Sequence, residues 1–85
     1  MNEITWTTKA VRQFRKLPTE TQRCIGAGVS TLADWPEVHN VKKLAGRPDY
    51  RLRVGNFRIF FTINPGGQVT IVQIEEVKKR DEHTY

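Results

Sequence analysis

The sequence feature that most constrains the fold is an alternation of apolar and polar side chains on both sides of a Gly-Asn pair. The alternating runs are residues 50–54 (YRLRV) and 57–63 (FRIFFTI), and Gly55-Asn56 separates them. A period of two indicates strands that bury one face, and a two-residue connection starting with Gly is typical of a type II′ hairpin turn. Counting outward from this turn predicts that Leu52 lies opposite Ile59 on the apolar face.

The other face of this hairpin concentrates positive charge. In the same register Arg53 lies opposite Arg58, and Arg51 lies opposite Phe60. Like charges in directly opposed positions destabilise a sheet, so a sequence shaped by folding alone would tend to avoid them. Two interpretations remain open. The arginines bind phosphate through their planar donor forks while Phe60 stacks a base, or they form the solvated face of an ordinary hairpin.

Shorter patterns elsewhere predict the remaining elements. In chain order these are a strand at 3–7, helices at 9–17 and 19–34, a loop at 36–49 and a central strand at 68–77. Thr19 and Gln22 have the spacing of a capping box for the second helix, and Gly26 and Gly28 weaken that helix or permit close helix–sheet approach. The fold class expected is α+β: an N-terminal strand, two helices and a three-strand antiparallel meander, with the helices on one face of a small twisted antiparallel sheet.

Charge narrows the class of partner. The 85 residues form one small domain with a thin core, and 14 basic against 9 acidic residues give a net charge of +5. Residues 41–85 hold nine basic and five acidic side chains, so +4 of this charge lies in the second half. Such a surface favours a polyanionic partner, which leaves nucleic acid, an acidic protein and an anionic membrane surface open.

The cysteine and histidine content excludes an internal disulfide and a zinc-binding motif. Cys24 has no second cysteine to pair with, and His39 and His83 are too far apart for a zinc motif. The first ten residues lack the pattern of a signal peptide, and no apolar run approaches the roughly 18 residues of a membrane span. A cytoplasmic protein without metal or other cofactor is expected.

The end of the chain adds a second basic group, Lys78, Lys79 and Arg80, followed by His83 and Tyr85. Histidine titrates near neutral pH, and a tyrosine hydroxyl can donate a proton to a leaving oxygen. These two residues are therefore candidates for proton transfer, although a histidine so near the end of a chain is more often exposed and without a role.

Motifs in the hairpin, in the loop before it and at the end of the chain match those of a known protein family. They are Leu44-x-Gly46, Tyr50-Arg51-x-Arg53-x-Gly55-x-x-Arg58-Ile59 and the ending Lys79-Arg80-Asp81-x-x-x-Tyr85. In these motifs, and in its order of strands and helices, the chain resembles the RelE/ParE superfamily of toxins from bacterial type II toxin–antitoxin modules. The resemblance covers essentially the whole chain and implies a single RelE-like domain over residues 1–85.

For the RelE branch, the resemblance implies a metal-independent endoribonuclease that cleaves messenger RNA in the ribosomal A site. A ribose 2′-hydroxyl attacks the adjacent phosphate, which requires a base, cationic donors and an acid. The implied catalytic residues are Arg51, Arg53, Arg58, Arg80, His83 and Tyr85. The residues expected to contact RNA around them are Lys42, Lys43, Arg47, Phe60, Lys78 and Lys79.

The assignment of roles departs from RelE at one point. By this resemblance, RelE has lysines at the positions of Arg51 and Arg53. Arginine is a poor base because it stays protonated at any ordinary pH. The two arginines are therefore expected to stabilise charge. The base and acid roles fall to His83 and Tyr85, unless the ribosome supplies part of the chemistry.

Two other functions remain as alternatives. The ParE branch implies binding and poisoning of DNA gyrase with no chemistry by the toxin, and a non-catalytic RNA-binding module would use the arginines only for grip. The ending with Arg80 and Tyr85 favours the nuclease, because a gyrase binder has no evident need for it. The resemblance also implies a cognate antitoxin that forms a hetero-oligomer with the toxin, in addition to the ribosome and messenger RNA as partners.

Overall fold

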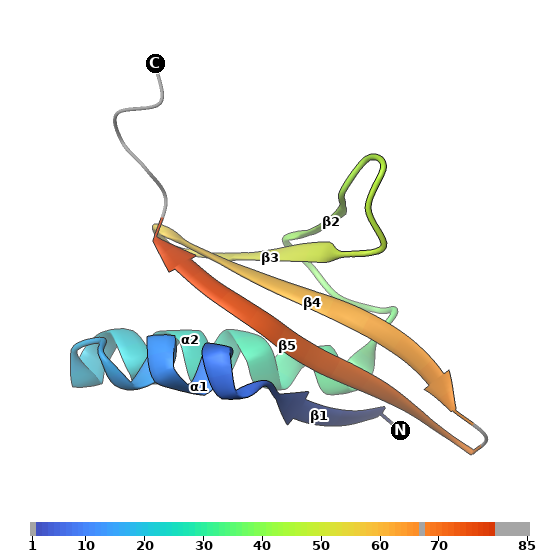
Figure 1. The fold of residues 1–85 in the computed structure, drawn as a ribbon, viewed down its shortest axis with the longest axis horizontal. Helices are drawn as coiled ribbons and strands as arrows, with labels where there is room; N and C mark the ends of the chain where they lie inside the picture. Colours follow the sequence, from blue (N-terminus) through green and yellow to red (C-terminus); the bar gives the residue numbers. More distant parts are fainter. Residues whose placement is uncertain (1, 67, 80–85) are drawn as a thin grey trace.

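The computed structural model describes residues 2–66 and 68–79, which form a five-stranded sheet with two α-helices on one face (Figure 1). The elements in chain order are β1 (Asn2–Trp6), α1 (Thr8–Arg15), α2 (Thr19–Ser30), the 3₁₀-helix η1 (Thr31–Asp34), β2 (Val41–Lys43), β3 (Tyr50–Val54), β4 (Phe57–Gly66) and β5 (Val69–Lys79). The strand order is β1-β5-β4-β3-β2, so β5 lies inside the sheet with a partner strand on each side, as expected, and β4 is the middle strand. The α+β class is confirmed.

The hairpin of β3 and β4 has the predicted register. Leu52 pairs with Ile59, and Val54 pairs with Phe57 across the turn. Gly55 has a φ of +56° and Asn56 does not have a positive φ, which is the combination that a type II′ turn requires. Glycine at this position therefore sets the turn, and the turn sets which side chains share a face.

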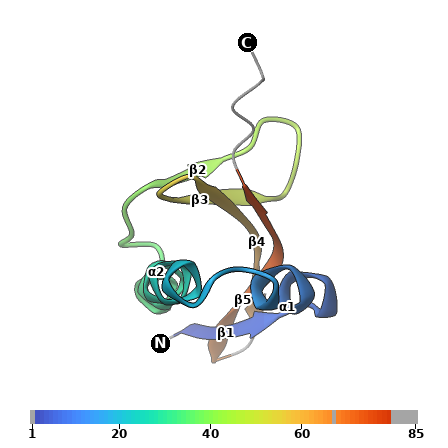
Figure 2. The same ribbon diagram turned by 90° about the vertical axis from the view of Figure 1, so that its left-hand side faces the viewer.

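The core lies between the helices and one face of the sheet. Leu52, Ile59 and Val77 form a row across β3, β4 and β5, and each is at most 6% exposed. Figure 2 shows the two helices together on the side of the sheet that this row faces. The helices contribute Ala10, Ile25 and Val29, all of them buried. Burial of one face leaves the opposite face of β3, β4 and β5 to polar side chains.

No helix within the described ranges has the length and apolar character needed to cross a membrane.

The sheet is mixed, whereas an entirely antiparallel sheet was expected. β1 pairs with β5 in parallel, with Ile4 opposite Val72. β1 covers the edge of β5 only as far as Ile74. Further along this edge α1 lies beside β5, and the side chain of its Gln13 accepts a hydrogen bond of 2.7 Å from the backbone N–H of Val77. A buried edge donor is thereby satisfied without strand pairing.

The expected loop at 36–49 contains a strand. Val41–Lys43 forms β2 and pairs with β3, and the carbonyl of Asn40 accepts a further hydrogen bond from the N–H of Arg53 at 2.9 Å. Three residues are too few for a recognisable period of two, and the flanking prolines and glycine indicate a loop. The expectation was wrong because the pairing depends on β3 lying alongside.

The start of the second helix also differs from the expectation. The residue before α2 is Pro18, and no side chain caps the helix, so the capping box of Thr19 and Gln22 is wrong. Gln22 instead donates through Nε2 to the carbonyl of Leu17 at 2.9 Å. Its amide therefore ties the connection between the helices. The regular α-helix ends at Ser30 instead of continuing to Asp34, and η1 completes that segment.

We expect Gly28→Ala to destabilise the protein and Gly26→Ala to stabilise it. A Cβ at Gly28 would lie 2.6 Å from Cγ2 of Val54 on β3, whereas a Cβ at Gly26 would meet nothing within 4 Å. Overpacking costs about 1–3 kcal/mol, and the gain in helix propensity is about 1 kcal/mol. Urea unfolding of both variants measures the difference. Equal shifts in the free energy of unfolding would contradict a close approach of α2 and β3 at Gly28.

Candidate phosphate-binding site

The face of the sheet opposite the helices carries three arginines from adjacent strands. Arg51 and Arg53 are alternate residues of β3, so they share a face, and Arg58 of β4 pairs directly with Arg53. The predicted opposition of two arginines is confirmed. Arg53 is exposed, while Arg51 and Arg58 are half-buried. The hairpin register therefore holds three guanidinium groups near one another on a rigid strand pair.

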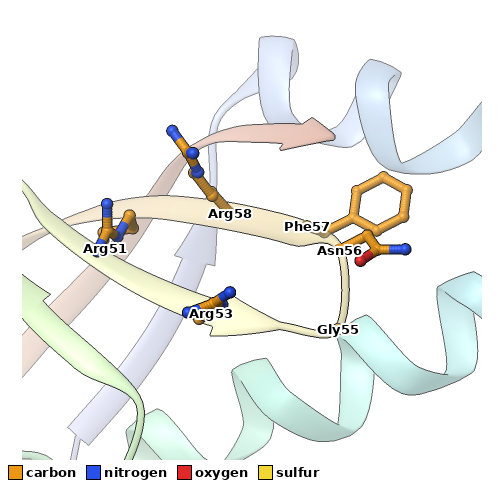
Figure 3. Close-up of a pocket in the computed structure, with 6 residues that line it drawn as sticks. All are labelled: Arg51, Arg53, Gly55, Asn56, Phe57 and Arg58. Atoms are coloured by element: carbon orange, nitrogen blue, oxygen red, sulfur yellow. The ribbon is translucent and has the colours of Figure 1, made fainter. Parts of the chain in front are cut away.

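These arginines border a small pocket at the end of the hairpin (Figure 3). Its volume is about 110 Å³, and its lining residues are Arg51, Arg53, Gly55, Asn56, Phe57 and Arg58. Pockets that hold drug-sized ligands measure about 300–1,000 Å³. This pocket is smaller and is bordered by cations, so it suits a single anionic group such as a phosphate.

None of the three arginines forms an ion pair with a carboxylate in the part of the chain that the structure describes. The ion pairs found there join Lys9 and Lys78 to Glu76, and Arg47 to Asp49. Like charges held close without counterions repel one another, and a bound anion would relieve that repulsion. This arrangement favours the phosphate-binding interpretation over a passive solvated face.

Two lysines extend the basic face along the same rows. Lys42 of β2 pairs with Arg51, and Lys78 of β5 pairs with Arg58. Both are exposed. Directly paired residues point to the same face of a sheet, so the basic surface spans four strands, from β2 to β5.

Arg47 reaches this face from the loop between β2 and β3. Its guanidinium carbon lies 6.0 Å from the centre of the Phe60 ring, and its Nη2 lies 2.6 Å from a carboxylate oxygen of Asp49. Phe60 is half-buried and pairs with Arg51. An aromatic ring between cationic groups is a surface on which a nucleobase can stack.

The last two predicted RNA contacts lie on the other face of the sheet. Lys43 pairs with Tyr50, and Lys79 pairs with Phe57, so these two lysines lie on the helix side of the sheet. Sequence reasoning also missed Asn56, which lines the pocket. Its position in the turn next to the paired arginines is the signal that could have found it.

Three of the predicted catalytic residues lie outside the described residues: Arg80, His83 and Tyr85. Their roles stay predictions. Within residues 2–66 and 68–79 there is no group of three or more His, Cys, Asp or Glu side chains that could hold a metal ion.

Comparison of sequences places the chain with a family of toxins. The sequence profile described as "ParE toxin of type II toxin-antitoxin system, parDE" matches residues 4–82. No curated protein sequence matches the chain.

Solved structures of related toxins share the fold. A chain of the toxin–antitoxin complex RelBE2 from Mycobacterium tuberculosis is 24% identical with a TM-score of 0.78, and the match covers 93% of this chain and 98% of that one. The isolated RelE toxin of E. coli is 13% identical with a TM-score of 0.80, over 99% and 89% of the two chains. A YoeB/ParE toxin from Agrobacterium tumefaciens is 10% identical with a TM-score of 0.75, over 93% and 99%. At these identities the similarity shows the fold.

Proposed function

We propose that this chain, which belongs to the ParE toxin family of type II toxin–antitoxin systems within the RelE/ParE superfamily, acts as a RelE-type endoribonuclease on messenger RNA at the ribosome. The observation that carries the proposal is the pocket bordered by Arg51, Arg53 and Arg58, none of which is paired with a carboxylate in the described ranges. Three arginines that line a pocket of about 110 Å³ fit a protein that holds a phosphate group during its cleavage.

The proposed reaction uses these cations to stabilise charge. Attack of a ribose 2′-hydroxyl on the adjacent phosphate places additional negative charge on the phosphate oxygens in the transition state. Guanidinium groups held on paired strands can donate to those oxygens without reorganising, which is the largest contribution in many enzymes. Arg51 and Arg58 are half-buried on strands that are paired on both sides, so their positions are more restricted than that of exposed Arg53.

The surrounding residues would hold the message. Lys42 and Lys78 lie on the same face, at opposite margins of the arginine cluster, and can contact phosphates on either side of the scissile one. Phe60 can stack a base, and His83 or Tyr85 would supply a proton to the leaving 5′-oxygen. Lys43 and Lys79, on the other face, would contact RNA only where it wraps the edge of the sheet.

The proposal includes a cognate antitoxin and action in the cytoplasm. Several structures with this fold are toxin–antitoxin complexes, including RelBE of E. coli and RelE–RelB of Pyrococcus horikoshii. An acidic antitoxin segment that covers the arginine face would neutralise the net charge of +5 and block the pocket.

Inhibition of DNA gyrase is the second candidate, and the family profile favours it because its description names ParE toxins. In that case the basic face would be a binding surface and no bond would be cleaved. A nuclease would produce cut messages in cells that make the protein, whereas a gyrase inhibitor would produce trapped gyrase–DNA complexes.

Expression in cells distinguishes these functions. We expect induction of the wild-type protein to produce new 5′ ends within translated messages, at positions in register with the reading frame, while plasmid supercoiling is unchanged. An Arg53→Glu variant, which reverses charge at the pocket, should produce neither the cuts nor growth arrest. Intact messages together with trapped gyrase–DNA complexes would contradict the nuclease and support the gyrase candidate.

A further inference from the structure

We propose that Glu76 is the general base that takes the proton from the attacking 2′-hydroxyl. This inference rests on the proposed nuclease function and adds the group that the arginines cannot supply, since a guanidinium does not deprotonate at ordinary pH. It assigns a catalytic residue on β5, a strand from which only basic residues were expected to contribute.

Glu76 lies on the same face as the arginine cluster. It pairs with Phe60 of β4, which in turn pairs with Arg51 of β3, so these residues form one row across the sheet. The next row holds Arg58 and Lys78. Diagonal neighbours in adjacent strands are about 7–8 Å apart at the backbone and are within reach of long side chains. Glu76 therefore lies one row from Arg58 on the same face, close enough for its side chain to reach the ribose of a phosphate bound there.

An irregularity in the sheet contributes to this placement. The register of β4 and β5 shifts between Phe60 and Phe61, so Glu75 has no partner residue on β4 while Glu76 remains opposite Phe60. Bulges of this kind redirect side chains and are common next to active sites. Here the extra residue brings two carboxylates to a face that otherwise carries cations.

The two carboxylates differ in their hydrogen bonds. Oε2 of Glu75 accepts from Thr62 at 3.0 Å and from Gln73 at 2.7 Å, so its position is fixed by neutral donors within the sheet. Glu76 is contacted through Oε1 only, by Nζ of Lys9 at 3.4 Å and of Lys78 at 3.8 Å. In the described ranges Oε2 of Glu76 has neither a hydrogen bond nor an ion pair, so it can accept a proton.

Lys9 and Lys78 restrict where this carboxylate can point. The side chain of Glu76 is 21% exposed, whereas those of Lys9 and Lys78 are 65% and 62% exposed. Lys9 approaches from α1 and Lys78 from the same strand, so the two ammonium groups hold Oε1. The charged groups around Glu76 are these lysines, Glu75 beside it and Arg58 diagonally opposite.

The proposed step balances without a further reactant. Oε2 of Glu76 accepts the proton of the 2′-hydroxyl, the 2′-oxygen forms a bond to phosphorus, and the bond from phosphorus to the 5′-oxygen breaks. The 5′-oxygen takes a proton from an acid, for which His83 and Tyr85 are the candidates, or from water. The products are a 2′,3′-cyclic phosphate and a 5′-hydroxyl, and Glu76 returns its proton to solvent.

The test compares Glu76→Gln with the wild-type protein in single-turnover cleavage of a message on programmed ribosomes. We expect the rate to fall by about 10²- to 10⁴-fold, as for loss of a general base. Binding to the same ribosomes carrying a 2′-O-methyl message, which lacks the nucleophile, should change less than threefold. The products of the residual reaction should be unchanged.

Two matched variants separate chemistry from structure. Glu75→Gln removes the neighbouring carboxylate, and Glu20→Gln removes an exposed carboxylate of α2; both should cleave within about threefold of the wild-type rate. A Glu76→Gln variant that cleaves normally, or a Glu75→Gln or Glu20→Gln variant that is equally impaired, would overturn the role of Glu76. A wild-type protein that cuts no message would overturn the nuclease function itself, and this role with it.

Discussion

Replacing Arg58 with alanine is expected to slow cleavage of ribosome-bound messenger RNA by about 10²- to 10³-fold, the usual effect of removing one preorganised donor from a developing oxyanion. Arg58 is half-buried, lines the pocket and pairs with Arg53. Its guanidinium is held where charge would accumulate on the phosphate. Because that charge is greatest in the transition state, binding of the message should weaken much less than the rate.

Two further variants give this prediction its controls. Arg12→Ala removes the same charge from an exposed position of α1, away from the pocket, and should leave the rate within about twofold of wild type. Arg58→Lys keeps the charge but loses the planar fork, so an intermediate rate is expected. Equal losses in Arg12→Ala and Arg58→Ala would show that only net charge matters, which would contradict a defined phosphate site.

Replacing Phe61 with alanine is expected to lower the free energy of unfolding by about 3–5 kcal/mol. Phe61 is 0% exposed, and its ring centre lies 5.5 Å from that of Tyr50 and 5.8 Å from that of Trp35. The change would remove a large side chain where β4 meets the loop after η1. For a chain of 85 residues, whose total stability is on the order of 4–13 kcal/mol, such a loss is a large fraction.

Urea unfolding followed by tryptophan fluorescence measures this effect, since Trp35 contacts the substituted position. Val69→Ala is the matched control, because Val69 is the one large apolar residue of the described chain that is exposed, at 41%. It should change the free energy of unfolding by less than about 0.5 kcal/mol. Similar losses in both variants would contradict a core centred on β4.

The register of the hairpin could be predicted from sequence because it depends on local information. A Gly at the first turn position and apolar residues at every second place fix the pairing of Leu52 with Ile59, and the pairing of Arg53 with Arg58 follows by counting. The arrangement of the three arginines therefore follows from residues 50–63 alone, whereas the place of Lys42 depends on β2, which no local pattern indicated.

Features that depend on distant residues could not be predicted in the same way. The parallel pairing of Ile4 with Val72 joins segments 68 positions apart, and no local pattern encodes it. The bond from Gln22 to Leu17 competed with a capping box of equal local plausibility. The role proposed for Glu76 depends on a bulge, which shifts register without any glycine or proline to mark it.

The pairing of β1 with β5 also has a consequence for how the protein is made. β1 precedes the other strands in the chain, yet residues 2–6 pair with residues 70–74, so a growing chain cannot complete its sheet until β5 has been added. Contacts of such high sequence separation slow folding and leave early segments unpaired during translation. A chain that still lacks β5 therefore leaves both β1 and the outer edge of β4 without a partner strand.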